Sequence, residues 1–381
     1  MKVLIVSTNL SHPTDAGNRA AIMGQVQILL HLGCEVHFLF VDMSLRWTDE
    51  SAMREYWQGN YHVFHLSTLG KVRRVLTDKL RPRFSGGHWK CDDHYPFGLE
   101  KYVRLLNQKQ HFDAVIIQYM RLSRLLPGID IPRKAIYTHD VFSYKDLRIG
   151  GPFYEACDAN EEAKAMQRCP NIFAIQKEEA IYYKFIAPKS RVFTVYNPYE
   201  FHQQPVCGNQ NILYLASRME FNVTGIRWFL EQVWPKLLIV HPEAKLLIGG
   251  TVCQHIAQSQ YPNVELQGFV ESLDDFYRQG DIVINPVYQG TGMKIKTFES
   301  LSYGKTTIVH PHSATGIFQK DSAPIHCTAD ADEWVSTLNQ MLCPGYDHAG
   351  NQKAAKAYIE AMYGYIAKQY DIFLNEDNPI K

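Results

Sequence analysis

The chain of 381 residues has no long hydrophobic run, and this absence removes several classes of protein at once. No stretch approaches the roughly 20 consecutive apolar residues that a membrane-spanning helix needs. The first residues, MKVLIVSTNLSHP, contain one lysine and a short apolar run, less than the core of a signal peptide requires. We therefore expect a cytoplasmic protein whose contact with a membrane, where there is one, is peripheral at the inner face.

Motifs for metal, redox and dinucleotide chemistry are also absent. The eight cysteines form no CxxC pair, which argues against a zinc ribbon and indicates reduced thiols. No aspartate-rich set of metal ligands stands out, so we expect no metal and no cofactor. Gly17 and Gly24 are too far apart for a GxGxxG fingerprint, which argues against a nicotinamide-dependent oxidoreductase.

Charge is balanced over the whole chain but not between its halves. The net charge is zero, which gives no signature of nucleic-acid binding. Residues 1–195 hold 26 Lys and Arg against 20 Asp and Glu, and the remainder holds 13 against 19. A basic half of this kind suits contact with an anionic surface or ligand.

Short apolar strands alternate with helical segments along both halves of the chain. A strand at Val3–Val6 precedes a helix from Asn18 to Leu32, and the next strand is Val36–Val41. Further strands are expected at Ala114–Gln118, Lys134–Thr138, Asn171–Ile175, Arg191–Val195, Ile212–Ala216, Lys245–Ile248, Val264–Gln267, Ile282–Ile284 and Thr306–Val309. Further helices are expected at Gly225–Leu238, Trp334–Leu342 and Gln352–Phe373. This alternation predicts an α/β protein with doubly wound parallel sheets.

A polar, proline-containing segment at 197–209 indicates a domain boundary. We expect two Rossmann-like domains, at 1–200 and 209–350, followed by a C-terminal helical segment at 351–381. Ligands of such sheets bind beyond the carboxyl ends of the strands. Two such domains are expected to face each other across a cleft.

Residues 282–304, IVINPVYQGTGMKIKTFESLSYG, carry the most specific pattern in the chain. An apolar strand leads through a glycine turn at 290–292 into a helix that carries Lys294, Lys296 and Glu299, the last about two turns in. Glycines allow close approach of a ligand, and the free N–H groups of a helix start bind anions. The lysines suit phosphate, and the carboxylate suits two sugar hydroxyls. The pattern favours a nucleoside-diphosphate sugar over an ordinary capped helix with solvated lysines.

Other candidate residues follow predicted strands, and each has both a possible ligand-binding role and a purely structural explanation. Gly17 precedes a helix, where it can meet a phosphate or form a simple cap. His139 can contact a sugar hydroxyl or pair with Asp140. Arg218 can bind a diphosphate through its planar guanidinium or lie solvated beside Glu220.

Two more segments can likewise be explained by a binding role or by structure alone. Phe269 and Val270 follow a strand, where they can line a base or form an ordinary strand-to-turn connection. Residues 61–84 mix six Lys and Arg with Val and Leu, as in a helix that binds an anionic membrane or a phosphorylated acceptor. A solvated helix face explains the second pattern equally well.

With these residues in place, the chain resembles nucleotide-sugar glycosyltransferases of the GT-B fold, in the family 4-like group (glycosyl transferases group 1). The resemblance covers nearly the whole chain and is strongest from Ile212 to Gly316, over LYLASRMEFNVTGIRWFLEQVWPKL and QGFVESLDDFYRQGDIVINPVYQGTGMKIKTFESLSYGKTTIV. In the first half, DAGNRAA resembles the glycine loop of the family and YTHDV its histidine at the end of a strand.

The resemblance implies a role for each matching residue. The implied donor-binding residues are Gly17, Arg218, Phe269, Val270, Gly290, Thr291, Gly292, Met293 and Lys294. The implied catalytic residues are His139 beside the anomeric carbon, Lys296 at the diphosphate and Glu299 at the ribose. The final helix is expected to pack back on the first domain, as in relatives.

Two positions depart from the family pattern. Many relatives have two glutamates seven residues apart, and Thr291 stands here in place of the first. Many also have a lysine after the position of Arg218, where this chain has Glu220 and Asn222. The first departure puts the identity of the sugar and turnover itself in question, and the second removes one cation from the diphosphate site.

The implied function is transfer of a hexosyl group from a nucleoside-diphosphate sugar to a hydroxyl acceptor, with retention of configuration and without a metal. Glycan or polysaccharide biosynthesis is the expected setting, with a glycan, a lipid-linked or a small-molecule acceptor and no nucleic acid. A nucleotide-sugar epimerase of similar fold and a nucleotide-sugar-binding protein without turnover are the alternatives. Formation of an altered sugar from the donor alone would indicate the epimerase.

Overall fold

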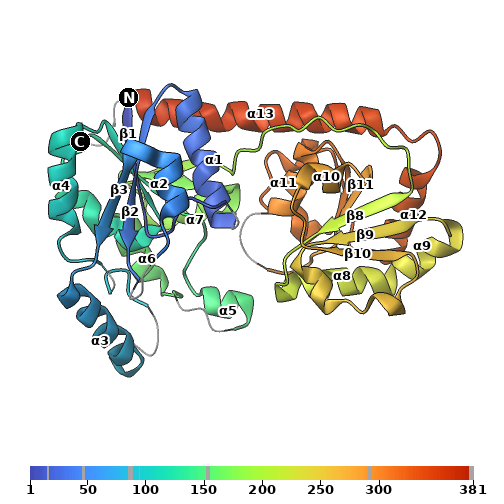
Figure 1. The fold of residues 1–381 in the computed structure, drawn as a ribbon, viewed down its shortest axis with the longest axis horizontal. Coiled ribbons are helices and arrows are strands. Elements are labelled where there is room, and N and C mark those ends of the chain that lie inside the picture. The colour runs from blue at the N-terminus through green and yellow to red at the C-terminus, as the bar shows by residue number, and fades with distance from the viewer. Residues whose placement is uncertain are drawn as a thin grey trace. The chain divides into compact units, whose positions relative to one another are not determined.

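The computed structural model describes residues 1–14, 17–44, 48–84, 89–93, 95–151, 155–290 and 294–376. The chain forms two compact units (Figure 1). Unit 1 contains Met1–Pro198 together with Tyr365–Lys381, and unit 2 contains Tyr199–Gly364. The division therefore falls within the proline-containing segment that follows the last strand of unit 1.

Unit 1 is built on a parallel sheet with the strand order β3-β2-β1-β4-β5-β6-β7. Its strands are β1 (Lys2–Ser7), β2 (Glu35–Asp42), β3 (Tyr61–His65), β4 (Ala114–Gln118), β5 (Arg133–Tyr137), β6 (Asn171–Ala174) and β7 (Arg191–Thr194). Its helices are α1 (Gly17–His31), α2 (Ser51–Trp57), α3 (Thr68–Phe84), α4 (Leu99–Gln110), α5 (Lys145–Ile149), α6 (Ala159–Met166) and α7 (Lys177–Ile186), with 3₁₀ segments η1 (Gln58–Asn60) and η2 (Met120–Gly128).

The central strands of unit 1 are apolar because both faces of the sheet are covered. Leu4 and Val6 of β1 pack in a core with α4, α6 and α7. Val3 and Ile5 alternate to the opposite face and are also fully buried. Parallel strands buried on both faces have near-continuous apolar sequences, which is why the sequence pattern predicts them well.

Unit 2 has a second parallel sheet, in the order β10-β9-β8-β11-β12-β13. Its strands are β8 (Asn211–Leu215), β9 (Lys245–Gly249), β10 (Val264–Gly268), β11 (Ile282–Asn285), β12 (Thr306–Val309) and β13 (Ile325–Cys327). Its helices are α8 (Glu220–Gln232), α9 (Trp234–Val240), α10 (Leu273–Tyr277), α11 (Ile295–Ser302) and α12 (Ala331–Leu342), with 3₁₀ segments η3 (Thr251–His255), η4 (Gln258–Gln260), η5 (Pro311–Ala314) and η6 (Lys320–Ser322).

Helices also cover both faces of the sheet in unit 2. One core joins β8 and β9 to α8, α9 and α12. A smaller core on the other face contains Leu213, Phe276, Tyr277 and Tyr303. The predicted α/β class, with two doubly wound parallel sheets, is confirmed.

The predicted helix Gly225–Leu238 is wrong in extent. The structure has α8 starting at Glu220 and a separate α9 starting at Trp234, with Val233 between them. Pro235 lies in the first turn of α9. Proline has no N–H to donate to the preceding turn, so it fits the start of a helix and interrupts one that tries to continue.

A long final helix, α13 (His348–Asn375), contributes to both units. In unit 2, Gln352 donates a hydrogen bond of 2.7 Å to the carbonyl oxygen of Gln204. In unit 1, Tyr370 and Phe373 pack on Phe173 of β6, with ring centroids 4.8 and 5.0 Å apart. The expected segment 351–381 is thus shared between the units.

Two expectations from composition concern thiols and membranes. All eight cysteines are free thiols, four of them buried. Within the described ranges, no helix is both long and apolar enough to cross a membrane.

Candidate functional site

The start of α11 brings together the side chains that the sequence singled out in unit 2. Lys294 is the N-terminal capping residue, and the helix proper begins at Ile295. Lys296 and Glu299 are three residues apart, so their side chains share one face of the helix. Glu299 is the fifth helical residue, a little over one turn in, which corrects the expected two turns. Both side chains are partly buried.

Lys296 is fixed by an amide from another element. Its Nζ donates a hydrogen bond of 2.7 Å to Oδ1 of Asn222 in α8. Asn222 is 1% exposed, and its Nδ2 donates to the carbonyl oxygen and Oγ of Ser217 at 3.0 and 3.1 Å. Burial lowers the pKa of Lys296 to about 8, although the charge of Glu299 opposes the decrease.

Glu299 is positioned by an aromatic neighbour. Its Oε1 accepts a hydrogen bond of 2.7 Å from the hydroxyl of Tyr277 in α10. Tyr277 is buried and stacks on Tyr303, with centroids 4.3 Å apart. Burial raises the pKa of the Glu299 carboxyl, while the bond from Tyr277 and the charge of Lys296 act in the opposite direction. One carboxylate oxygen thus remains for a ligand, judged from the described neighbours.

The turn before α11 approaches α8 closely. Gly290 has a φ of 110°, a conformation that favours glycine, and a Cβ there would lie 3.4 Å from the ring of Phe221. Lys294, after the turn, lies 3.1 Å from Nε2 of His312 in η5. The predicted residues Thr291, Gly292 and Met293 fall outside the described residues.

The remaining predicted residues of unit 2 follow β8 and β10. The backbone N–H of Arg218 donates to Oγ1 of Thr251 at 2.9 Å, and its side chain is exposed. Phe269 is 79% exposed, whereas Val270 packs against the smaller core of unit 2. An exposed phenyl ring beside a strand end is available to a planar ligand.

In unit 1, His139 follows β5 and has a φ of 61°. Its Nε2 lies 2.7 Å from Oε1 of Gln118, and its ring stacks on Tyr119 at a centroid distance of 4.2 Å. An amide oxygen only accepts hydrogen bonds, so Nε2 carries the proton. Burial, with a smaller effect of the Arg121 charge, lowers the pKa of His139 to about 3.

The hydrogen bonds continue from His139 into the core. Nε2 of Gln118 donates to Oε1 of Gln25 in α1 at 2.6 Å, and Nε2 of Gln25 donates to the hydroxyl of Tyr370 in α13 at 2.9 Å. Gln118 and Gln25 are both buried. This series of hydrogen bonds fixes the orientation of each side-chain amide and connects His139 to α13. Gly17, the other candidate of unit 1, is the first residue of α1.

The alternative from the sequence was that His139 pairs with Asp140. The structure instead places His139 against Gln118 and Tyr119. Asp140 instead forms an ion pair with Lys145, with Oδ2 and Nζ 2.5 Å apart. Likewise, Arg218 has no ion pair with Glu220 among the described residues.

Sequence reasoning missed four residues that position the candidates. These are Gln118, Asn222, Tyr277 and His312. In the sequence, Asn222 stands out only because it lies where many relatives have a lysine. Gln118 is the last residue of β4, and the other three lie in helical segments that follow strands, so position relative to a predicted strand end is the signal that could have found them.

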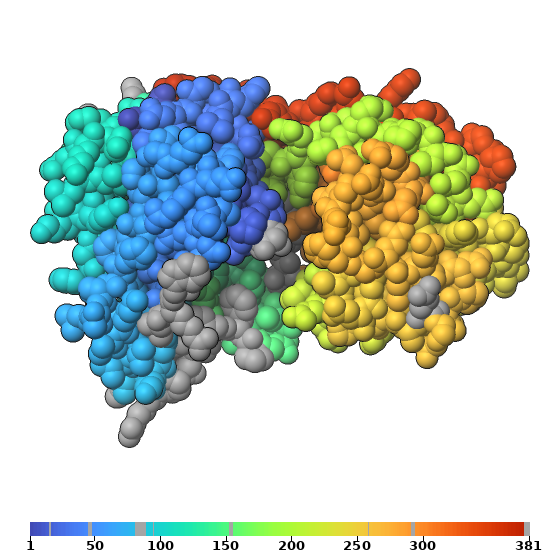
Figure 2. Space-filling model, in the orientation of Figure 1, coloured from blue at the N-terminus to red at the C-terminus, as the bar shows by residue number. Residues whose placement is uncertain are grey.

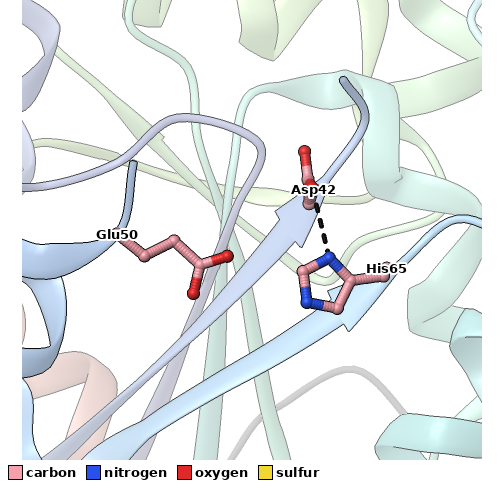
Figure 3. A group of neighbouring side chains, drawn as sticks. All are labelled: Asp42, Glu50 and His65. Atoms are coloured by element: carbon pink, nitrogen blue, oxygen red, sulfur yellow. Dashed lines mark hydrogen bonds and ion pairs between the residues drawn. The ribbon is translucent and has the colours of Figure 1, made fainter. Parts of the chain in front are cut away.

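A mixed group of possible metal ligands lies in unit 1. Asp42, Glu50 and His65 each offer one ligand atom, and these atoms lie within 4.8 Å of one another. Figure 3 shows Glu50 extending toward the other two, and Asp42 bonded to His65, with Oδ2 and Nδ1 3.1 Å apart. Asp42 also accepts hydrogen bonds from Ser44, and Glu50 pairs with Arg54. These contacts account for the two carboxylates without an ion.

Comparison with known proteins bears on the same segment of unit 2. Residues 210–343 match the family Glycosyl transferases group 1. The matching residues number 134 of the 381. They include Lys296, Glu299, Asn222 and Tyr277.

Whole-chain likeness extends to both units. An uncharacterized 44.6 kDa protein in the cps region of Klebsiella pneumoniae is 23% identical over 330 residues, which cover 79% of this chain and 80% of that protein. The crystal structure of S. aureus TarM aligns with a TM-score of 0.68 at 8% identity, covering 98% of this chain and 99% of that one. Anabaena HepE in complex with UDP aligns with a TM-score of 0.64 at 11% identity, covering 98% of each chain. The chain has the GT-B fold of these glycosyltransferases.

Proposed function

We propose that this protein transfers a hexosyl group from a nucleoside-diphosphate sugar to a hydroxyl acceptor. The observation that carries the proposal is the pairing of Lys296 and Glu299 on the first turns of α11, each fixed by a partner from another element. A partly buried ammonium suits a diphosphate, and a carboxylate with one free oxygen suits a pair of ribose hydroxyls. Both residues lie inside the segment that matches Glycosyl transferases group 1.

The donor is proposed to be a UDP-sugar. The HepE structure and a structure of the pneumococcal O-GlcNAc transferase GtfA are complexes with UDP, which supports this choice. Lys294, Lys296, Arg218 and the N–H groups that open α11 would neutralise the diphosphate. Phe269 would pack on the base, with Val270 behind it, and the turn at 290–293 would meet the phosphates and the sugar.

The reaction is proposed to retain configuration. The bond from the anomeric carbon to the diphosphate oxygen breaks, and the bond to the acceptor oxygen forms on the same face of the sugar. The acceptor proton passes to the departing diphosphate. Cationic and N–H groups set in advance stabilise the charge that develops on that leaving group. His139, neutral and fixed by Gln118, would contact the sugar, and Gly17 would meet the diphosphate.

Catalysis is proposed to need no metal, because the lysines and N–H groups supply the positive charge. Full transfer activity after treatment with EDTA supports this, and activity restored only by an added divalent cation contradicts it. The variant His65→Ala tests whether Asp42, Glu50 and His65 of unit 1 hold a metal, since such a metal would be lost with the imidazole.

The deciding experiment is a thermal-shift screen with UDP-, GDP-, ADP- and dTDP-sugars, because a ligand stabilises the state that it binds. NMR spectra of the product then give the anomeric configuration. Thr291, in place of a glutamate of many relatives, favours one alternative, a protein that binds the nucleotide sugar without turnover. Donor binding without transfer to any hydroxyl acceptor would support that alternative.

A peripheral membrane location is proposed for the basic unit 1. Leu69, Val72, Leu76 and Leu80 of α3 are 75, 52, 52 and 47% exposed, and they recur at helical spacing. Arg73 and Lys79 are exposed on the same helix. Figure 2 shows α3 (paler blue, residues 68–80) at the surface of unit 1. A lipid-linked acceptor in an otherwise cytoplasmic setting, in glycan biosynthesis, would suit this helix.

A further inference from the structure

A cavity of about 460 Å³ lies on the outer face of α8 in unit 2. The lining includes Arg227, Trp228 and Glu231 of α8, Tyr288 after β11, and Asp330 before α12. Neither Lys296 nor Glu299 lines it. Its volume is within the range of about 300–1,000 Å³ that is common for small-molecule sites.

The cavity side of α8 is the face that the core does not use. Ile226 and Phe229 are fully buried against the sheet, whereas Arg227 and Glu231, one turn apart, are exposed. Trp228 lies between these faces. Its ring meets Trp334 of α12 edge-on at a centroid distance of 5.9 Å, which fixes its position.

Several polar groups around the cavity have hydrogen-bonding capacity to spare. Oδ1 of Asp330 accepts from the N–H groups of Asp332 and Glu333 at the start of α12, which leaves Oδ2. Arg227 uses Nη2 on the carbonyl oxygen of His255 and keeps its other donors. Glu231 has no hydrogen bond or ion pair with the described part of the chain. The arrangement can therefore accept and donate several hydrogen bonds to one ligand.

The charges around the cavity favour a neutral ligand over an anionic one. Two carboxylates, Glu231 and Asp330, face one guanidinium, that of Arg227, so the cavity is net negative. A diphosphate or an acidic sugar would be repelled. The indole of Trp228 and the phenol of Tyr288 offer flat apolar surfaces with a polar edge. A neutral pyranose presents apolar C–H faces and a rim of hydroxyls, and so fits both features.

We infer that this cavity binds a neutral oligosaccharide segment, at a site separate from that of the nucleotide sugar. The inference goes beyond the proposed transfer reaction, since this site performs no chemistry and needs no donor. Tyr288 is two residues before Gly290, and α8 also carries Asn222. The cavity therefore lies beside the elements that shape the turn before α11, but neither Asn222 nor Gly290 lines it.

Calorimetric titration with cellotetraose, maltotetraose and N-acetylchitotetraose, in separate experiments, tests the inference. We expect saturable binding of at least one of them, with the same affinity when UDP is present at saturation. Trigalacturonate should bind at least about tenfold more weakly, which corresponds to about 1.4 kcal/mol. No binding of the three neutral probes, competition by UDP, or tighter binding of trigalacturonate would each overturn the inference.

Variants locate the site. Glu231→Ala and Tyr288→Ala alter exposed side chains, so folding should be preserved, as circular dichroism can verify. Each should weaken oligosaccharide binding about fivefold to tenfold, the effect of one or two lost contacts. Glu265→Ala, at an exposed position on β10, is the matched control and should bind as the wild type does. Equal affinities for all four proteins would contradict the assignment. UDP binding, measured in parallel, separates this outcome from failure of the proposed function.

Discussion

Lys296 donates a hydrogen bond of 2.7 Å from Nζ to Oδ1 of Asn222. The two residues are 74 positions apart in the sequence, and the bond connects the start of α11 with the first turn of α8. In many relatives, by the sequence resemblance, a lysine follows the position of Arg218. Here an amide oxygen faces the remaining lysine, so it solvates the ammonium without repelling it.

The first prediction concerns the pH dependence of UDP binding. Burial lowers the pKa of Lys296 to about 8, so the ammonium is present below pH 8 and is lost above it. An anionic ligand favours the ammonium, so UDP affinity should fall as the pH rises from 7 to 9.5. Lys296→Met should bind UDP about tenfold or more weakly at pH 7 and lose most of this slope. Titration calorimetry measures both, with Lys245→Met, at an exposed position on β9, as control. An identical slope in Lys296→Met would contradict the assignment.

The second prediction concerns the carboxylate of Glu299. Glu299→Gln retains the size of the side chain and its acceptor for Tyr277, but removes the charge that strengthens hydrogen bonds to ribose hydroxyls. UDP affinity should fall about tenfold to a hundredfold, as expected for hydrogen bonds to a charged group. Glu265→Gln is the charge-matched control on the same unit. Unchanged UDP affinity in a folded Glu299→Gln protein would remove the central residue of the proposed site.

The third prediction concerns the imidazole of His139. Because burial lowers its pKa to about 3, the ring should stay neutral and protonated at Nε2 throughout pH 5–9. The ¹⁵N chemical shifts of the ring should therefore be constant over that range. Gln118→Leu removes the acceptor at Nε2, so the proton should redistribute between the two ring nitrogens at an unchanged net charge. A protonation step of His139 near pH 6 would contradict the burial that lowers its pKa.

The fourth prediction concerns a buried acid near the same strand end. Glu179 of α7 is 5% exposed, and burial, reinforced by Asp140 and Glu162, raises its pKa to about 8. In the unfolded chain the carboxyl ionises near its ordinary value, so the fold loses stability as the pH rises from about 4.5 to 8. The loss at pH 8 is at most about 5 kcal/mol. Glu179→Gln should raise the thermal midpoint at pH 8 and leave it nearly unchanged at pH 4.5.

The neighbouring residue provides the control for this comparison. Glu178→Gln alters an exposed side chain on the same turn of α7 and should follow the wild-type pH dependence. The prediction is wrong if Glu179→Gln shows the same decrease in midpoint between pH 4.5 and 8 as the wild type.

The fifth prediction concerns α3. The protein should sediment with vesicles that contain phosphatidylglycerol, less so at high salt, and should not sediment with phosphatidylcholine alone. Leu76→Asp should abolish most of the binding, because it places a charge in the apolar stripe. Ile181→Asp, at a position on α7 that is 61% exposed, is the control for general loss of exposed hydrophobicity. Absence of sedimentation with either lipid would indicate that α3 is a solvated face.

The central strands could be predicted from sequence because burial on both faces leaves a continuous apolar run. Two edge strands, β3 and β13, lack this run and were missed, whereas β7 and β10, which also lie at sheet edges, were predicted. β3 mixes polar and apolar residues, none of them fully buried, and β13 has three residues, two of them exposed. Edge strands are paired on one side, so their sequences are less constrained.

The residues of the candidate site that lie in one segment could be predicted from the sequence. Those that reach the site from distant segments could not. Lys294, Lys296 and Glu299 are close in sequence, and a strand followed by a turn and a helix start is a local pattern. Tyr277 and Asn222 reach the same helix from segments 22 and 74 residues away. Only the packing of α8 and α10 around α11 brings them there, and periodicity carries no information on such pairings.

Because α13 supplies Tyr370 and Phe373 to the core of unit 1, that unit is not a continuous piece of polypeptide. A ribosome releases the last strand of unit 1 long before it releases these two rings. The whole of Tyr199–Gly364 emerges in between. Unit 2 can therefore complete its core during translation, while the face of Phe173 that contacts Tyr370 and Phe373 stays uncovered until α13 has emerged.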